Sequence, residues 1–538
     1  MQTMEGLFLA FVMATAPLAA QNPLLNLVVN AASGIPPGLP NSGIAQGALF
    51  RIWGVGIGPS TLQIAQLPLP PALGGTSITV TVSGFTVTAP MDFTSVGEVG
   101  GVLPSNTPIG NGTMTLTYNG NSGSIPITVV PATFGISHID EYLTDNGWDI
   151  RSVALVTFPN YQYVSDTNTA KPGDTLTLWG TGLGATPNNG GDTMLGPVVN
   201  IGSAPLVFVG GVQSPSVTYW GRSPNTVAGL DQINFLVPSD APLGCNVSVV
   251  VQTATPTTVS NSPTIALAAT EGATCSDPTR SLPPYFFNKG GLKVMTLGIG
   301  QNETVTLNTD GTITHLTTSG ATVQLLQLTQ ALTPATTQGL NVAPSLGTCT
   351  TGPLNDGIDD LPAANLNGGT SFTLTPPSGT ALTLSSQYPF GYWSGNSSTK
   401  LPSGTWIFSN GLGGSDVGPE QFSFLVPPQV TWSNAAAMYG NPIDRSSPFT
   451  ITWSGGDSNS YVRISGIARG FRFVCAAPTS PGQFTIPSSI LMSLPADQGG
   501  SISVATVAFP SSMGTVPGFD ATVYWDSFAT TAVPVPFK

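Results

Sequence analysis

Side chains that could act as a catalytic base are few in this sequence. It contains two histidines, His138 and His315. A serine hydrolase needs such a base beside its nucleophile. Residues 456–458 read Gly-Asp-Ser, which loosely resembles the surroundings of a nucleophilic serine, but Asn459 breaks the pattern and the run lies between two expected strands. We therefore interpret residues 456–458 as a turn and predict no catalytic residue.

Acidic side chains gather in two short segments. One follows His138 and contains Glu141, Asp145 and Asp149, which could bind a cation or supply the carboxylate pair of a glycosidase. The other, residues 356–360, reads Asp-Gly-Ile-Asp-Asp and could hold calcium, but it lacks the alternation and the terminal glutamate of an EF-hand loop. We interpret the first segment as a solvated loop between domains and the second as an exposed turn, and expect no metal or cofactor.

Aromatic side chains offer a different chemistry, the stacking of sugar rings. Tyr392 and Trp393 lie between turn formers in Phe390-Gly-Tyr-Trp-Ser-Gly395, so they are the candidate residues for an exposed glycan-stacking face. Packing in a core or under a loop is the alternative for this pair. Tryptophans that end or alternate within apolar strands are expected in cores, and these are Trp53, Trp179, Trp432, Trp453 and Trp525.

A duplicated stretch determines how the domains are counted. Gly47-Ala-Leu-Phe-Arg-Ile-Trp-Gly-Val-Gly-Ile-Gly58 matches Gly173-Asp-Thr-Leu-Thr-Leu-Trp-Gly-Thr-Gly-Leu-Gly184. Each copy is an alternating, half-buried strand followed by glycines that permit a sharp turn. Downstream, Leu103-Pro-Ser-Asn-Thr-Pro-Ile-Gly110 matches Val237-Pro-Ser-Asp-Ala-Pro-Leu-Gly244. Two landmarks in the same order indicate a duplicated domain, in which Trp53 is equivalent to Trp179 and Pro104 to Pro238.

The composition favours short strands joined by turns. The 538 residues include 64 Gly and 49 Pro, and runs of Val, Ile, Thr, Phe and Trp recur at short intervals. We predict an all-β chain of serial immunoglobulin-like β-sandwich domains, with helix limited to single turns such as one beginning near Pro487. The expected units are a signal peptide at 1–20, domains at 21–131 and 132–270, a linker at 271–284, a β-rich domain at 285–428 and a β-sandwich at 429–538.

Charge and cysteine usage point to an exported protein. Residues 6–20 are apolar and end in Leu-Ala-Ala before Gln21, as in a secretory signal, although the usual positive start is missing. No later segment is long enough to cross a membrane. The net charge of −13, with 13 scattered basic residues, disfavours a nucleic-acid partner.

Four cysteines suit an oxidising compartment. Cys245 and Cys275 flank one strand-rich stretch, and we predict a disulfide between them. A bridge between Cys349 and Cys475 would join two expected domains, and the sequence leaves that pairing open.

A longer pattern carries a family resemblance. Residues 173–184 resemble the start of an IPT/TIG immunoglobulin-like domain. Together with Asn168–Asp174, Gly221-Arg-Ser-Pro-Asn225, Gly229–Phe235 and Val237-Pro-Ser, they are similar to a domain of secreted proteins of soil bacteria. The resemblance covers about 134–270 and is degenerate over 28–131. It implies the fold and an extracellular location, and brings no catalytic residues.

The expected function follows from these observations. It is non-catalytic: a secreted or cell-surface protein with an adhesion, matrix or scaffold role, whose partners would be polysaccharides or surface proteins. The alternative is a carbohydrate-binding protein or an accessory part of a glycan-degrading system.

Overall fold

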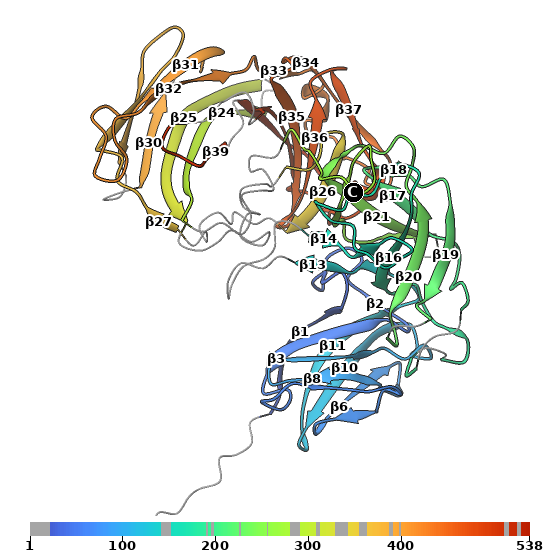
Figure 1. Ribbon diagram of the computed structural model, residues 1–538. Coiled ribbons are helices and arrows are strands. Elements are labelled where there is room, and N and C mark those ends of the chain that lie inside the picture. Colours follow the sequence, from blue (N-terminus) through green and yellow to red (C-terminus); the bar gives the residue numbers. More distant parts are fainter. Residues whose placement is uncertain are drawn as a thin grey trace, which may run out of the picture.

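The computed structural model describes residues 22–140, 152–189, 192–194, 198–224, 227–254, 257–279, 291–307, 313–328, 343–353, 363–386, 391–397, 400–509, 516–524 and 529–538. The regular structure of this part of the chain is almost entirely strand, with very little helix, as predicted (Figure 1). Its helices are α1 (Ser488–Leu491), directly after Pro487 as expected, and the 3-10 turns η1 (Pro187–Asn189) and η4 (Ala436–Met438). None of the described helices is long and apolar enough to span a membrane. The expected signal peptide lies outside the described residues.

The first domain is a sandwich of two sheets with immunoglobulin strand order. One sheet runs β1-β3-β9-β8-β4, and the other runs β2-β11-β10-β6-β5 with β7 beside β6. In immunoglobulin letters these are A-B-E-D and G-F-C-C′, with the short strand β2 added parallel to G. The strands are β1 (Leu24–Asn30), β2 (Ile44–Ala45), β3 (Leu49–Val55), β4 (Gln63–Ile64), β5 (Ala72–Leu73), β6 (Thr76–Val82), β7 (Phe85–Ala89), β8 (Met91–Thr94), β9 (Glu98–Val102), β10 (Gly110–Tyr118) and β11 (Asn121–Val130).

The second domain repeats this order. Its sheets run β12-β16-β20-β19, with β15 beside β16, and β13-β14-β23-β21-β17-β18, with β22 beside β21. Here β14 takes the place of β2, parallel to the last strand. The strands are β12 (Gly135–Ile136), β13 (His138–Asp140), β14 (Ser152–Ala154), β15 (Val156–Thr157), β16 (Thr175–Thr181), β17 (Leu206–Val209), β18 (Val212–Gln213), β19 (Val217–Arg222), β20 (Asp231–Leu236), β21 (Gly244–Ala254), β22 (Thr257–Val259) and β23 (Thr264–Leu267).

Strand register supports the duplication residue by residue. Trp53 in β3 pairs with Glu98 in β9, and Trp179 in β16 pairs with Gln232 in β20. The two pairs occupy equivalent positions in equivalent strands of the two domains. Pro104 and Pro238 then follow β9 and β20 at equal distances. Glycine is required at this position in both domains for the same reason. A Cβ at Gly54 would lie 2.2 Å from a carbonyl oxygen of β1, and a Cβ at Gly180 would lie 2.2 Å from a carbonyl oxygen of β12.

The two motif tryptophans do not lie in the sandwich cores, contrary to the expectation. Ile52 and Leu178 belong to the cores of their domains, so the next residue along each strand points to the opposite face. Trp53 is half-buried, and Trp179 is buried with its indole Nε1 donating to Thr157 Oγ1. Trp432 and Trp453 are core residues as expected, and Trp525 lies outside the described residues.

The C-terminal half forms one continuous sheet. This 14-stranded sheet runs β26-β36-β35-β38-β40-β24-β25-β30-β29-β28-β31-β32, with β27 beside β25 and β39 beside β24. The expected division between residues 428 and 429 therefore does not separate two sheets, although two hydrophobic cores remain distinct. The strands are β24 (Lys293–Leu307), β25 (Ile313–Leu328), β26 (Thr348–Pro353), β27 (Ala363–Asn365), β28 (Ser371–Thr375), β29 (Leu382–Ser386), β30 (Tyr392–Ser397), β31 (Gly404–Ser409), β32 (Gln421–Val426), β35 (Ser460–Ala468), β36 (Phe471–Pro478), β38 (Ser501–Ala508), β39 (Ala521–Tyr524) and β40 (Ala529–Pro534).

A long hairpin joins the two halves of that sheet. The strands β24 and β25 pair with each other along their whole length. The start of β24 pairs with β39 and its end with β40, both parallel. Figure 1 shows this hairpin curving with the strands beside it.

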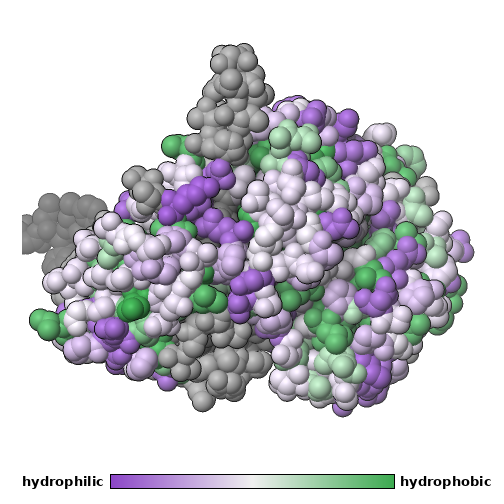
Figure 2. All heavy atoms as spheres, turned by 90° about the horizontal axis from the view of Figure 1, so that it is seen from above, coloured by the Kyte–Doolittle hydropathy of each residue, from purple (hydrophilic) through white to green (hydrophobic). Residues whose placement is uncertain are grey.

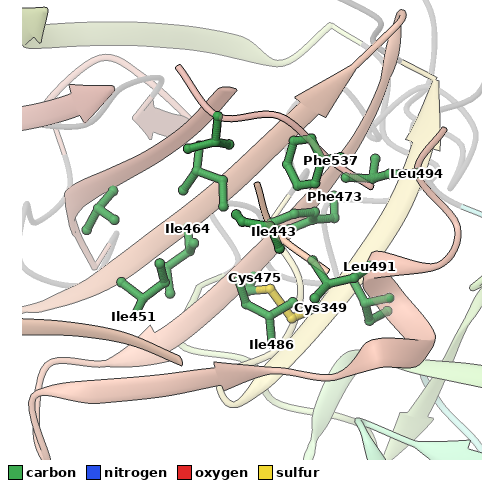
Figure 3. Packing of buried hydrophobic residues seen from close by; sticks show 14 of the residues in the cluster. Cys349, Ile443, Ile451, Ile464, Phe473, Cys475, Ile486, Leu491, Leu494 and Phe537 are labelled. Carbon is green, nitrogen blue, oxygen red and sulfur yellow. A yellow bond between two sulfur atoms is a disulfide. The ribbon is translucent and has the colours of Figure 1, made fainter. Parts of the chain in front are cut away.

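The last sandwich is closed by a small sheet, β33-β34-β37, with β33 (Val430–Trp432), β34 (Phe449–Gly455) and β37 (Gln483–Ile486). Aliphatic and aromatic side chains from both sheets and from α1 fill the space between them (Figure 3). The Cys349–Cys475 disulfide lies in this core and links β26 to β36, which are neighbours in the sheet. It therefore holds β26 within the last sandwich instead of joining two separate domains.

The other disulfide, Cys245–Cys275, has the predicted partners, with Cα atoms 5.3 Å apart. It fastens the segment after β23 to the start of β21. Residues 271–284 were expected to form a linker, but their described part is packed. Asp277 Oδ1 accepts hydrogen bonds from Thr279, and Asp277 Oδ2 accepts one from the Cys245 amide at 3.2 Å.

We predict that both disulfides form and that they differ in their contribution to stability. The loops they close span 30 and 126 residues, so the chain-entropy model gives about 3.5 and about 5 kcal/mol. Urea unfolding of the Cys245→Ala/Cys275→Ala and Cys349→Ala/Cys475→Ala variants measures this, after non-reducing peptide mapping of the unaltered chain. Free thiols in the map, or a Cys275–Cys349 peptide, would contradict the assignment.

Candidate functional site on the outer face of the second domain

The predicted glycan-stacking pair does not form an exposed face. Trp393 lies in β30 and is fully buried, because strand alternation turns it into the hydrophobic core that β24, β25, β28, β31 and β32 also line. Its ring stacks on Phe372 with centroids 4.1 Å apart, and its Nε1 donates to the Gly369 carbonyl at 3.1 Å. Tyr392, the preceding residue, is half-buried. The flanking glycines and prolines gave a turn-like sequence to what is a core strand.

Among the titratable residues considered as site candidates, His138 lies in the described part of the second domain. His138 Nδ1 lies 3.0 Å from the Ile136 carbonyl and 3.1 Å from Asn261 Nδ2. Glu141, Asp145, Asp149 and the acidic run 356–360 lie outside the described residues. Within the described ranges, no three His, Cys, Asp or Glu side chains are grouped so that they could hold a metal ion.

Residues 456–458 form a turn, as interpreted from the sequence, and line a shallow open depression together with residues 479–482. The Asp457 carboxylate accepts hydrogen bonds from the amide and side chain of Asn459 at 2.9 and 3.0 Å. The Asp457 carbonyl accepts one from Thr479 Oγ1 at 2.8 Å. The aspartate therefore shapes the turn.

A buried ion pair joins the first two domains. Arg222 and Asp231 face each other at the end of the β19-β20 ladder, and their side chains are 1% and 0% exposed. Arg222 Nη2 donates to the Gly47 carbonyl of the first domain at 2.8 Å, and Asp231 Oδ2 accepts from the Gly182 and Leu183 amides. Burial raises the pKa of the Asp231 carboxyl, and the Arg222 guanidinium and the two amides oppose that change.

Other polar contacts extend this joint. The Ser105 amide and hydroxyl donate to the two carboxylate oxygens of Asp192, each at 2.7 Å. Thr181 Oγ1 accepts from the Leu49 amide at 2.9 Å. By register, the residues of the first domain equivalent to Arg222 and Asp231 are Val96 and Gly97, so the first domain lacks this ion pair.

We predict that Arg222→Met destabilises the protein by about 3–5 kcal/mol, because it leaves the Asp231 carboxylate buried without its partner. Urea unfolding followed by tryptophan fluorescence measures the loss. The double variant Arg222→Met/Asp231→Leu should recover most of it, since no buried charge then remains.

The matched control is Arg51→Ala, which breaks the partly exposed pair between Arg51 and Glu98. It should cost less than about 1 kcal/mol. An Arg222→Met variant that is no less stable than this control would refute a buried, energetically important joint.

The outer face of the β12-β16-β20-β19 sheet carries a row of uncharged polar and aromatic residues. Register places Tyr163 opposite Thr157, Thr157 opposite Thr177, Thr177 opposite Asn234, and Asn234 opposite Tyr219. Residues that pair directly across neighbouring strands share a face of the sheet. The residues next to the row in the sequence lie on the other face and pack into the core of the second domain. They are Val156, Phe158, Val164, Leu176, Leu178, Trp220, Ile233 and Phe235. The row therefore points outward. Figure 1 shows β19 and β20 at the periphery of the molecule.

The tyrosines at the two ends differ in exposure and support. Tyr163 is 59% exposed, and its carbonyl accepts a hydrogen bond from Asn168 Nδ2 at 2.9 Å. Tyr219 is half-buried because its ring lies over Gly221: a Cβ there would be 2.8 Å from the Tyr219 hydroxyl oxygen and 3.1 Å from Cζ. The Tyr219 hydroxyl donates to the Arg222 carbonyl at 2.6 Å. Its ring thus lies flat along the strand.

An amide lies between these tyrosines. Asn234 Oδ1 accepts hydrogen bonds from Thr177 Oγ1 at 3.1 Å and from Gln232 Nε2 at 2.9 Å. These bonds fix the orientation of the carboxamide. Thr157 is buried, and its Oγ1 accepts from the indole of Trp179, which strand alternation places on the same face. The face is therefore covered at Thr157, while the other members of the row keep part of their surface in solvent.

Sequence reasoning missed this row. The strand within 173–184 was expected, and the alternation in Gln232-Ile-Asn-Phe-Leu-Val237 separates outward amides from core residues. The register that aligns four strands was not readable from one chain. Elsewhere, Figure 2 shows hydrophobic residues scattered among hydrophilic ones on the face it presents.

Comparison with known proteins adds little to this geometry. No protein-family model matches the chain, and no curated protein matches it. Among solved structures, Sidekick-1 immunoglobulin domains 1–4 are 10% identical, with 96% of this chain and 99% of that chain covered and a TM-score of 0.12. Domains 5–6 of the S-layer protein SbsC are 12% identical, with 46% and 100% covered and a TM-score of 0.16.

The Plexin A4 extracellular region is 14% identical, with 46% of this chain and 18% of that chain covered and a TM-score of 0.14. This chain therefore spans less than a fifth of that structure. Scores of this size carry no argument about function. The immunoglobulin-like assignment rests on the strand order of the first two domains.

Proposed function

We propose that this chain is a non-catalytic, extracellular or cell-surface scaffold that holds several β-sandwiches in fixed positions and presents their outer faces to partners. The observation that carries the proposal is the construction of its joints. The first two domains share a buried ion pair, and the second domain shares a hydrophobic core with the last sandwich. Such joints suit adhesion or matrix roles, in which a surface must be presented at a fixed position.

The second joint is mostly apolar. Val250 and Val259 of the second domain belong to the core of the last sandwich, and Phe208 packs against it. Hydrogen bonds border this contact: the Asn246 amide donates to Ser345 Oγ, and the Thr351 amide donates to Ser262 Oγ, both at 2.8 Å. Relative motion of these domains would expose apolar side chains, which opposes it.

Two disulfides support an extracellular location, because such bonds persist in oxidising compartments. The resemblance of residues 134–270 to IPT/TIG-type domains of secreted soil-bacterial proteins supports the same location, and we propose membership of that group. The partners would be polysaccharides or other surface proteins.

We predict binding without turnover. The purified full chain is incubated with a panel of polysaccharides and unfolded proteins, and new reducing ends and new amino termini are measured over time. Neither should rise above the buffer blank. Product formation that co-purifies with the chain through a second column, and that is lost on heat unfolding, would overturn the scaffold proposal.

A further inference from the structure

We infer that the outer face of the β12-β16-β20-β19 sheet is a binding site for a neutral polysaccharide, which lies across the strands along the row Tyr163, Thr177, Asn234 and Tyr219. This goes beyond the proposed function by naming a site and a ligand class. The inference rests on the proposed function in one respect: both assume that the chain binds its partner without catalysing a reaction.

The spacing of the aromatic rings fits an extended ligand. The row crosses four strand-to-strand steps from Tyr163 to Tyr219, so its ends lie roughly 19 Å apart at the usual spacing of neighbouring strands. A pyranose ring has an apolar face of C–H groups, which packs on the face of an aromatic ring. Two tyrosines at this separation can contact different sugar units of one chain, whereas a single monosaccharide would reach only one.

The Tyr219 ring is prepared for such a contact. Gly221 lets the ring lie flat along β19, and the hydroxyl bond to the Arg222 carbonyl fixes its rotation. One face of the ring is therefore packed on the strand while the residue keeps part of its surface in solvent. Little side-chain entropy remains to be lost when a sugar stacks there, since the rotamer is already set.

The polar residues between the rings suit sugar hydroxyls. Asn234 Oδ1 accepts from Thr177 and Gln232, which fixes the carboxamide and makes its Nδ2 group the donor it can offer to a ligand. Hydroxyl groups of a sugar can accept from it and can also donate to the remaining lone pairs of the threonine and glutamine oxygens. A preset donor flanked by aromatic faces is typical of a site that orients a small polar ring.

The absence of charge along the row selects among glycans. Every member is uncharged, and the charges at the end of the β19-β20 ladder, Arg222 and Asp231, are buried and paired with each other. An acidic polysaccharide would find no cation here to compensate its carboxylates.

Affinity gel electrophoresis of the full chain tests the site. Hydroxyethyl cellulose, xyloglucan and galactomannan serve as neutral probes, and alginate serves as the acidic probe. At least one neutral polymer should retard the chain, and alginate should not. Tyr219→Ala should weaken retardation about 5- to 10-fold, as expected for one lost aromatic contact. Tyr219→Phe keeps the ring and should retain most of the binding.

Asn234→Ala and Tyr163→Ala keep the test decisive if Tyr219→Ala fails to fold, and each should weaken retardation several-fold. The matched control is Phe85→Ala, which removes an aromatic ring of 68% exposure from the first domain and should leave binding unchanged. No retardation by any neutral polymer, equal loss in the control, or alginate binding that survives in all row variants would overturn the inference. Any of these results without product formation would leave the scaffold proposal standing.

Discussion

The burial of strand β21 on both of its faces is the constraint on which the arrangement of this molecule depends. Val247, Val249 and Val251 fill the core of the second domain, while Val250, between them, belongs to the core of the last sandwich. A strand in a two-sheet sandwich normally keeps one face for solvent. Here the second face is covered by a part of the chain that begins about 100 residues later. The two units therefore form one packed body.

The two joints are built from different chemistry, and the difference has consequences. The joint between the second domain and the last sandwich is apolar and is bordered by backbone and hydroxyl hydrogen bonds. The joint between the first two domains is polar: Arg222 of the charge pair donates to the Gly47 carbonyl of the first domain, and Asp231 accepts from the Gly182 amide of its own domain. Buried charges tolerate few alternative partners, so this joint specifies orientation more than it adds stability. Together the joints leave only part of the outer face of the β12-β16-β20-β19 sheet exposed, because Trp179 and Thr181 on that face are buried and Thr181 bonds to the first domain.

Much of the fold was readable from the sequence because its signals are local. The alternation of strands, the repeated Trp-Gly-x-Gly turn and the second Pro-Ser landmark were enough to identify two equivalent domains. Non-local features were not readable. Trp393 sits among turn formers yet belongs to a core, and one sheet continues from the unit before residue 428 into the unit after it because β39 and β40 return to pair with β24. The row on the second domain depends on register across four strands, which hydrophobic pattern alone does not specify.

Rigidity of the joints is the central property of the proposed scaffold, since a scaffold with mobile joints would not present a surface at a fixed position. Pulsed electron–electron spin resonance measures this directly, with spin labels at two exposed sites, Phe85 in the first domain and Leu412 in the C-terminal half. The cysteines already present are held in disulfides, so Phe85→Cys and Leu412→Cys are the positions that take the labels. We expect one narrow distance distribution, which Arg222→Met broadens. A broad or multi-peaked distribution in the otherwise unaltered chain would contradict the account.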